Sequence, residues 1–473
     1  MQQRTLNQNP RTRAPTNPGT ISRYLGRTLP AFAVLSAIHL RHSLSYLLAG
    51  HPPPDLGYAA QSSVALQLLQ VACLLYLFVV YGLTLRHWRR DAWTPRDLAI
   101  VVIALTAAAW TLLPANSADI LDYLGFGRLF AVFHLNPYTH TYGEISDWFA
   151  TYVTWDDAMP YGPSLLPFFS VAGTLAGINV FVGLYALKLA WALLHLANAW
   201  MIYGVAESMA IDAGWAAFAF ACNPLILLEL PGNGHNDAVV IACTLGALLA
   251  LRRQRPTTAL ALASLGAMSK LPAIAWTGGI AMLLYRRRAW SSLASGVAIG
   301  ALLLLIVMFW PGALASLTVG SSQWHYTEDS LHMVAILTAT AISRAQGWSW
   351  DYMEAFQIDR IVATAVFIPC ACWMLSRIRE EADVIRECGY LLLALLLLYA
   401  SAVEPWYLTW LLPVLALTRA AAQRRVILTA GPSLLALYAF PYSFVEVSPH
   451  RLAWTAARLI VAFGVPIAAW IVA

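Results

Sequence analysis

Long runs of apolar residues, separated by short polar segments, repeat along almost the whole chain. A helix needs about 20 residues to cross the roughly 30 Å of hydrocarbon in a bilayer, and most of these runs approach that length. The runs lie near residues 30–50, 62–85, 98–114, 180–204, 214–230, 236–251, 257–269, 271–285, 290–310, 357–376, 389–403, 406–420, 426–440 and 452–472. The pattern predicts an all-α polytopic membrane protein with about 12–14 transmembrane helices.

Two apolar stretches are too short to be ordinary spans. A crossing at residues 164–177 would reverse the direction of the next span, so we expect an interfacial helix there on the outer side. The pair at 257–285 begins and ends beside arginine clusters, so it has to enter the membrane and return, with Lys270 at its apex. Broken helices of this kind occur where they are buried in protein or line a wet cavity.

The arginine-rich loops determine the predicted orientation. They are RHWRR (86–90), RRQR (252–255), RRR (286–288), RIREEADVIRE (377–387) and QRR (423–425). Because cytoplasmic loops are enriched in Lys and Arg, we place these loops and both termini in the cytoplasm. Residues 1–29 lack the apolar core of a signal peptide and predict a disordered cytoplasmic tail, followed by a single transmembrane domain at 30–473. The outer side then holds residues 115–178, 232–237, 311–355, 404–407 and 441–451, the first being a large loop with interfacial helices.

Composition agrees with this class of protein. Of 473 residues, 59% are hydrophobic and 11% are charged, against about 25% charged in a soluble domain. The formal net charge of +5 needs no nucleic-acid partner, because the arginines cluster in short loops between spans. The six cysteines lie in or beside apolar runs without zinc-site spacing, and we interpret them as packing residues.

Two acids stand where one span emerges on the outer side. Asp119 and Asp122 share a face about 5–6 Å apart if PANSADILDYLGFGR (114–128) is helical. One carboxylate could then hold a proton or a cation while the other orients it. The alternative is a cap on the next interfacial helix, with Asn116 or Ser117 at the N-cap and Asp119 near the positive end of the helix dipole. Arg128 offers a bidentate partner for a carboxylate or phosphate, or it extends towards lipid headgroups.

The lysine at the hairpin apex is the second candidate. An ammonium group inside a short apolar hairpin is costly unless it is paired, and charged residues within spans are functional candidates by default. We expect Lys270 to bind an anionic headgroup or phosphate, and the alternative is a structural pair with a loop acid. Lys188 lies near the middle of a predicted span, where a structural pairing is expected.

Further polar and aromatic residues are predicted on the same side. GNGHND (232–237) suits either a Gly-rich turn with a helix cap or a substrate contact, and Trp406 and Tyr407 also suit an interfacial aromatic belt. The candidate substrate-binding residues are His235, Asn236, Asp237, Tyr161, His325, Glu404, Trp406 and Tyr407.

Several short motifs follow one another in order between residues 98 and 420. They are SADILDYLGFGR (117–128) with LNPY (135–138), YGP (161–163), GHND (234–237), SKLPA (269–273), WHY (324–326) and PWYLTWLLP (405–413). Together they resemble the membrane-embedded GT-C glycosyltransferases, and most closely the bacterial polyprenyl-phosphate-mannose-dependent mannosyltransferases. The resemblance implies a GT-C-like helical bundle.

The resemblance also implies an inverting sugar transfer. Asp119 would be the general base for an acceptor hydroxyl, with Asp122 as its helper or as a residue that holds the loop. Lys270 and Arg128 would neutralise the departing polyprenyl phosphate. The implied donor is a polyprenyl-phosphate hexose, mannose by resemblance, and the acceptor is a lipid-linked molecule or glycan at the outer face of the bacterial inner membrane. No cofactor is required because phosphate is a good leaving group, although the two acids could hold a divalent cation.

A transporter or flippase of polyprenyl-linked glycan or lipid is the alternative function. It would also explain the many spans, the broken helix pair and the buried lysines. The absence of a visible inverted repeat, and the gathering of polar residues in outer loops, favour the enzyme.

Overall fold

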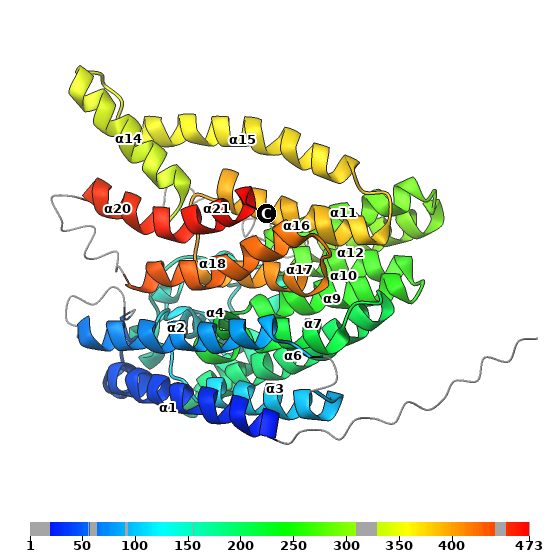
Figure 1. The fold of residues 1–473 in the computed structure, drawn as a ribbon. Coiled ribbons are helices and arrows are strands. Elements are labelled where there is room, and N and C mark those ends of the chain that lie inside the picture. The colour runs from blue at the N-terminus through cyan, green and yellow to red at the C-terminus, as the bar shows by residue number, and fades with distance from the viewer. Residues whose placement is uncertain are drawn as a thin grey trace, which may run out of the picture.

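The computed structural model describes residues 19–54, 56, 64–89, 93–154, 156–308, 329–439 and 451–472. Within these ranges the regular structure is helical, and most of the helices lie side by side in one bundle (Figure 1). One cluster of buried apolar residues extends from Tyr24 in the first helix to Phe463 near the C-terminus. The chain is therefore an all-α polytopic membrane protein, as the apolar pattern predicts.

The helices follow the predicted apolar runs closely. The N-terminal part comprises α1 (Gly19–Leu48), α2 (Val64–Arg86), α3 (Pro95–Trp110), α4 (Asp119–Ala131), η2 (Tyr142–Glu144), η3 (Trp148–Tyr152), η4 (Pro163–Leu165), α5 (Leu166–Ala176), α6 (Val180–Ser208), α7 (Ala213–Ala221), α8 (Pro224–Leu227), η5 (Leu228–Asn233), α9 (Asp237–Arg252), α10 (Pro256–Ala267), η6 (Leu271–Ala273), α11 (Ile274–Arg286) and α12 (Trp290–Met308). The C-terminal part comprises α14 (Leu331–Gln346), α15 (Tyr352–Ser376), α16 (Glu381–Leu398), η8 (Pro405–Leu411), α17 (Leu412–Leu417), α18 (Ala421–Ala439), α20 (Arg451–Leu459), η9 (Ile460–Gly464) and α21 (Val465–Ile471). The predicted hairpin is confirmed: α10 and α11 are separated by a break that contains Lys270.

Three of the described helices are long and apolar enough to cross a membrane, namely α2 from Ala65, α6 and α15. A fourth is counted if α7 and the following helix, which meet at an angle of 51°, form one span. The predicted continuous span at 214–230 is broken there because Pro224 cannot continue the ladder of α7, and the Asn223 side chain caps α8 by accepting the Leu225 amide. The total of about 12–14 spans stays a prediction.

The N-terminal helix begins before the predicted position, so the disordered tail assigned to residues 1–29 is too long. Helix α1 starts at Gly19. Tyr24 is buried, and its ring packs edge-on against Trp93 and Phe218 at centroid distances of 5.9 and 5.2 Å. These contacts explain why a segment of low hydropathy is helical. Residues 1–18 lie outside the described ranges.

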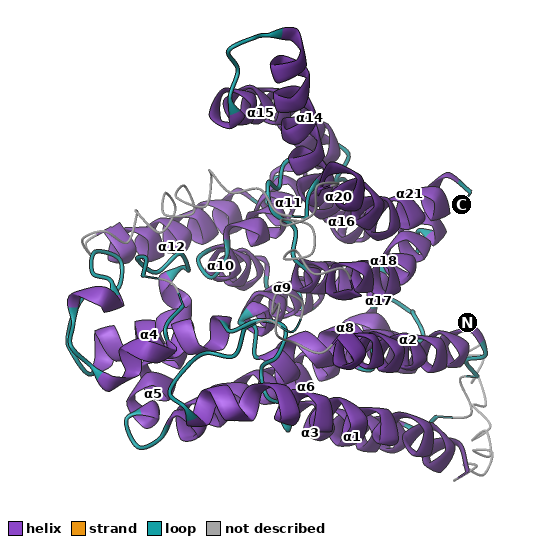
Figure 2. Cartoon of the chain, turned by 90° about the vertical axis from the view of Figure 1, so that its left-hand side faces the viewer, coloured by secondary structure: helices purple, strands orange, loops and turns teal. Residues whose placement is uncertain are grey.

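A second difference concerns residues 311–355, which the sequence predicts as an outer loop. Residues 331–346 of this segment form α14, which begins at a Ser330 cap whose hydroxyl accepts the Met333 amide. Helices α14 and α15 stand out from one edge of the bundle (Figures 1 and 2). Residues 311–328 lie outside the described ranges.

Glycines allow α4 and α5 to pack closely in the outer loop. A Cβ atom on Gly127 would lie 1.8 Å from the Phe169 carbonyl oxygen, and one on Gly173 would lie 2.6 Å from the Arg128 amide nitrogen. Small residues let helix backbones approach in a bilayer, where apolar lipid removes the usual hydrophobic drive for association. This contact fixes α4, and with it the carboxylate at its first residue, against α5.

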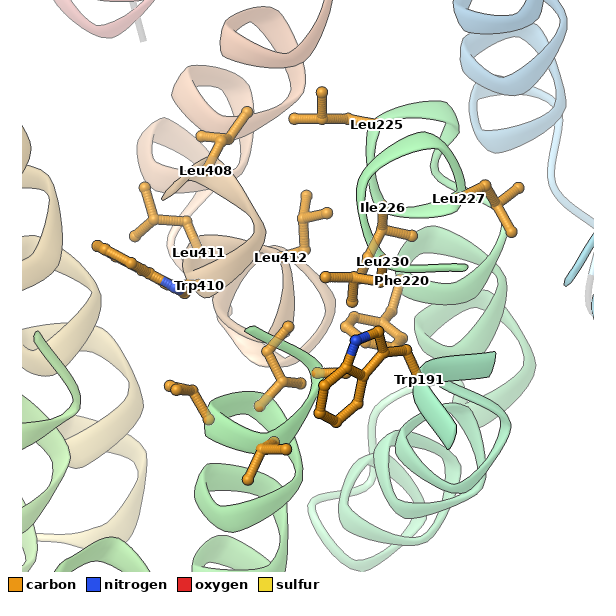
Figure 3. Packing of buried hydrophobic residues seen from close by; sticks show 14 of the residues in the cluster. Trp191, Phe220, Leu225, Ile226, Leu227, Leu230, Leu408, Trp410, Leu411 and Leu412 are labelled. Atoms are coloured by element: carbon orange, nitrogen blue, oxygen red, sulfur yellow. The ribbon is translucent and has the colours of Figure 1, made fainter. Parts of the chain in front are cut away.

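Large apolar side chains pack between the segments that carry the polar turn at 232–237 and the PWYLTWLLP motif. Figure 3 shows this cluster, which includes Trp191, Phe220, Leu225, Ile226, Leu227, Leu230, Leu408, Trp410, Leu411 and Leu412. Dense packing of this kind permits little movement of one element past another. Elements η5 and η8, which both supply polar residues to the site described next, are therefore held in a fixed relation.

Candidate active site

Asp119 is the first residue of α4 and has a partly exposed carboxylate. Its side chain is 13% exposed. The Ser117 hydroxyl donates to Oδ1 at 2.7 Å, and the Tyr123 hydroxyl donates to Oδ2 at 3.3 Å. The Ser117 oxygen also accepts the Asp119 amide at 3.2 Å. The N-cap residue of α4 is Ala118 and makes no side-chain capping bond, so the expected cap at Asn116 or Ser117 is wrong, whereas Asp119 does lie in the first turn. The carboxylate is therefore at the N-terminus of α4 and accepts from two hydroxyl groups.

His235 lies beside this carboxylate. Its Nδ1 is 3.8 Å from Asp119 Oδ2, and its Nε2 is 3.3 Å from Glu229 Oε2. The imidazole ring stacks on Trp406, with centroids 4.0 Å apart and planes inclined by 17°. Residues from α4, η5, the GNGHND turn and η8 therefore meet around one histidine.

Lys270 and Asp237 form an ion pair next to this group. The ammonium donates to both Asp237 oxygens, at 2.9 and 3.0 Å, and Trp410 Nε1 donates to Oδ1 at 2.6 Å. The structural pair with a loop acid, which the sequence left open for Lys270, is thus present. The lysine side chain remains 11% exposed, whereas that of Asp237 is fully buried.

Two tyrosines connect the Asp119 and Lys270 groups. The Lys270 ammonium lies 5.4 Å from the ring centre of Tyr161, whose hydroxyl is 3.4 Å from that of Tyr123. Burial raises the pKa of both phenols well above the ordinary value, so each stays a neutral hydroxyl. Two tyrosine hydroxyls therefore lead from Asp119 to Tyr161, and the Lys270 ammonium lies over the ring of that tyrosine.

Local backbone geometry explains why two positions in the motifs are glycine. Gly234 has φ +89°, which side chains rarely adopt, and a Cβ there would lie 2.4 Å from Ile120 Cδ1. Gly162 packs on the hairpin apex, where a Cβ would lie 1.5 Å from the Met268 carbonyl oxygen. The Gly162 amide donates to the Ser269 carbonyl at 3.1 Å. The YGP loop and the SKLPA apex are therefore joined through their backbones.

Asp122 and Arg128 do not join this cluster through any contact that the structure describes. Asp122 is fully buried and accepts hydrogen bonds from the backbone amide and the hydroxyl of Thr154, which is the loop-holding role considered for it. Arg128 is 4% exposed and pairs with Asp147 at 2.7 Å. Its Nε also donates to the Tyr142 hydroxyl at 2.9 Å. Both residues secure the outer loop.

The other predicted residues differ in how they are placed. Asn236 is fully buried, and neither polar atom of its side chain has a hydrogen-bond partner among the described residues. Tyr407 stacks on Trp410 with centroids 4.7 Å apart, and Glu404 is half-buried just before η8. His325 lies outside the described residues. Lys188 is buried and donates to the Leu112 carbonyl, in agreement with the structural role expected for it.

Glu229 is the member of this cluster that the sequence analysis missed. It is fully buried in η5, where Asn233 Nδ2 donates to Oε2 at 3.0 Å and the Tyr438 hydroxyl donates to Oε1. The available signal was a lone acid within the apolar run LILLEL (225–230), six positions before the histidine. Acids inside apolar segments are rare and mark functional sites.

The described residues contain no group of three or more His, Cys, Asp and Glu side chains with the spacing of a metal site. Asp119 and Asp122, which the sequence suggested as a pair for a divalent cation, are bound to different partners, Ser117 and Thr154. The metal requirement of the reaction stays a prediction.

The fold and this cluster define a polytopic membrane protein with carboxylates, a lysine and aromatic rings gathered in one polar site. Residues 24–286 match the family model described as alpha-(1->6)-mannopyranosyltransferase, N-terminal domain, and residues 331–468 match the MptB C-terminal domain. The chain belongs to the alpha-(1->6)-mannopyranosyltransferase family, which confirms the resemblance to membrane mannosyltransferases.

One curated relative is Alpha-(1->6)-mannopyranosyltransferase A from Corynebacterium glutamicum, which is 27% identical over 199 residues. The match covers 39% of this chain and 38% of that protein, so it extends over less than half of either. No solved structure matches the chain.

Proposed function

We propose that this protein transfers mannose from a polyprenyl-phosphate donor to a hydroxyl of a lipid-linked or glycan acceptor, with inversion at the anomeric carbon. The observation that carries the proposal is the partly exposed Asp119 carboxylate, linked through Tyr123 and Tyr161 to the Lys270 ammonium. A base and a cation connected through two tyrosines suit a displacement in which a proton is removed on one side and a phosphate leaves on the other.

In this mechanism Asp119 accepts the proton of the acceptor hydroxyl. The acceptor oxygen forms a bond to the anomeric carbon, and the bond from that carbon to the phosphate oxygen breaks. The electron pair leaves with the polyprenyl phosphate, so its negative charge grows in the transition state. A nearby ammonium stabilises that charge more than it stabilises the donor, and such differential binding lowers the barrier.

Lys270 is suited to this role because its ammonium group is held in place while part of its side chain remains exposed. Asp237 and the Tyr161 ring hold the ammonium, and its side chain is 11% exposed. An apolar groove of about 290 Å³ between α5 and α6 supports a place for the polyprenyl chain. Element η4 precedes α5 directly, and its Ser164 hydroxyl lies 2.7 Å from that of Ser269 at the hairpin apex.

The proposed reaction takes place at the outer face of the bacterial cytoplasmic membrane, with both termini inside. The arginine-rich loops support this orientation, because they lie at the opposite end of α9 and α11 from Asp237 and Lys270. No cofactor is required in this proposal, since the phosphate leaves without prior activation.

The test is mannose transfer by the purified protein from a polyprenyl-phosphate [14C]mannose donor to a mannan acceptor. We expect the wild type to transfer label, Asp119→Asn to lose at least about 10³-fold in kcat, and Lys270→Ala to lose about 10²–10³-fold. Asp157→Asn, which alters an exposed acid in the same outer loop, is the matched control and keeps wild-type kcat.

A wild-type rate of mannose transfer by Asp119→Asn would contradict the assignment of Asp119 as the general base. A wild type that never transfers sugar, but moves labelled polyprenyl lipid across vesicle bilayers, would instead establish the transporter alternative. The same preparations, with thermal unfolding in detergent as a folding check, serve for both measurements.

A further inference from the structure

A buried acid and a histidine stand in line behind the proposed base. His235 lies between Asp119 and Glu229, with one ring nitrogen 3.8 Å from the first carboxylate and the other 3.3 Å from the second. The histidine side chain is 1% exposed and Glu229 is fully buried. Glu229 is therefore out of reach of a substrate in the site, and any effect it has on the reaction passes through its neighbours.

Both nitrogens of His235 are buried without a hydrogen-bond partner among the described residues. An unpaired buried nitrogen is costly, so a histidine in this position is expected to have a polar task. Each nitrogen lies within 4 Å of a carboxylate oxygen, on opposite sides of the ring. Stacking on Trp406 fixes the ring plane.

Both carboxylates accept hydrogen bonds from hydroxyl or amide groups. Asp119 accepts from Ser117 and Tyr123, and Glu229 accepts from Asn233 and Tyr438. An ionised carboxylate only accepts hydrogen bonds. A neutral imidazole has one N–H and can donate to one of the two carboxylates, whereas an imidazolium has two N–H groups and can donate to both. The other charges at this turn are the Asp237–Lys270 pair and the buried Lys188.

We propose that His235 and Glu229 are positioning residues for the base, in which an imidazolium anchored by Glu229 and Trp406 orients the Asp119 carboxylate. The inference rests on the proposed function. When Asp119 takes the acceptor proton and becomes neutral, the cation keeps Glu229 as its counter-charge. A cation can thus remain beside the base throughout the reaction without being left alone in a buried site.

The test compares His235→Gln, Glu229→Gln and the double variant in the mannose-transfer assay. We expect each single change to lower kcat by about 10–100-fold, the range for outer partners of reacting groups, with KM within about twofold of wild type. We expect the kcat of the double variant to lie within about threefold of that of the slower single variant, because both residues act through one carboxylate.

His195→Gln is the matched control. This histidine is also buried and also stacks on an aromatic residue, Phe220, but it lies on α6, has one unpartnered ring nitrogen, and donates from the other to the Ala221 carbonyl. It should keep wild-type kcat. Thermal unfolding of every variant identifies losses that come from the fold alone, and Tyr438→Phe, which removes one donor to Glu229, is a milder second probe.

Four results would overturn the positioning role. They are a raised KM with unchanged kcat for His235→Gln, wild-type kcat for Glu229→Gln, multiplicative losses in the double variant, and an equal loss for His195→Gln. A wild type without transfer activity is a separate outcome, because it contradicts the proposed function itself and the inference that depends on it.

Discussion

Lys270 and Asp237 show how a charge inside an apolar hairpin is tolerated. The ammonium has a carboxylate at 2.9 Å, and the carboxylate in turn accepts from Trp410. Removing one partner of a buried pair costs about 3–5 kcal/mol, because the other charge is left uncompensated, whereas removing both costs far less. The pair therefore couples the hairpin to the start of α9.

This coupling predicts a specific pattern of stabilities. Lys270→Gln should lower the unfolding temperature in detergent by more than the double variant Lys270→Gln/Asp237→Asn does. The reason is that the single change leaves a buried anion and the double change leaves two neutral amides. Scanning calorimetry or a thiol-dye assay measures the unfolding temperatures of the wild type and both variants. A double variant with the lowest unfolding temperature would contradict the prediction.

Gly162 gives a second prediction at the scale of one residue. A Cβ atom at this position would lie 1.5 Å from the Met268 carbonyl oxygen, so Gly162→Ala has to separate the YGP loop from the hairpin apex. We expect a loss of about 1–3 kcal/mol in stability and a clear loss of mannose transfer. Gly26→Ala, with nothing within 4 Å, is the control and should be neutral or slightly stabilising.

Among single residues, the sequence identified those whose chemistry conflicts with an apolar setting. Lys270 was found in this way, whereas Asp119 and His235 were found as polar residues on the predicted outer side. The structure places His235 beside Asp119 and pairs Lys270 with Asp237. Spacing alone could not separate Asp119 from Asp122, because helical geometry places both on one face; the resemblance named Asp119 as the base, and the fold shows that Thr154 binds Asp122. For Arg128 the sequence left a carboxylate, a phosphate and lipid headgroups open, and its partner Asp147 could not be identified because it lies 19 positions away in an irregular loop.

At the scale of elements, the outer loop depends on short helical turns closed by acids. Glu144 caps η2, and the Gly143 amide donates to Asp156 Oδ1 at 2.7 Å. Hydrogen bonds from Thr141 and from this amide hold the pKa of Asp156 below its ordinary value of 3.8, and contact with His140 lowers the pKa of Glu144. These turns lead to Asp147, the partner of Arg128.

The lowered pKa of Asp156 predicts a pH dependence of the loop. A carboxylate with a depressed pKa in the folded state contributes stability above about pH 4, and the contribution is lost as pH falls through the folded value. Hydrogen exchange at the Gly143 amide, corrected for its intrinsic rate, should therefore accelerate below about pH 4. Asp156→Asn should show the faster exchange already at pH 7, and equal protection in both proteins would contradict this.

The sequence predicted helices better than their interruptions and ends. Apolar length located α2, α6 and α15, but periodicity cannot show that Asn223 and Pro224 begin a new helix at an angle of 51°. The start of α1 was missed because its stability comes from Tyr24 packing on rings 69 and 194 positions away, at Trp93 and Phe218. Long-range contacts of this kind leave no local pattern.

For the whole molecule, α9 connects two faces. It carries Asp237 at its first residue and Arg252 at its last, and its 16 residues span about 24 Å. Arg252 pairs with Glu381 at 2.6 Å, at the end of the bundle away from the site. The predicted orientation therefore places the outer loop and the arginine clusters on opposite sides of the membrane.

Cysteine labelling in intact cells tests this orientation. In a background without the native cysteines, Thr139→Cys should react with a membrane-impermeant maleimide, and Gln254→Cys should react only after permeabilisation. Both positions are exposed in the structure, so lack of access would come from the membrane and not from burial within the protein. The reverse labelling would place the site on the cytoplasmic side.

The pairing of Asp237 also has a consequence for biosynthesis. Lys270 follows Asp237 by 33 residues and Trp410 follows it by 173. At about 5–20 residues per second, the ribosome delivers the lysine roughly 2–7 seconds after the acid, and the tryptophan roughly 9–35 seconds after it. Asp237 is therefore without Lys270 as its partner when the ribosome has already completed α9. The ion pair that compensates this buried carboxylate therefore requires that residues 256–286 have already been synthesised and folded back.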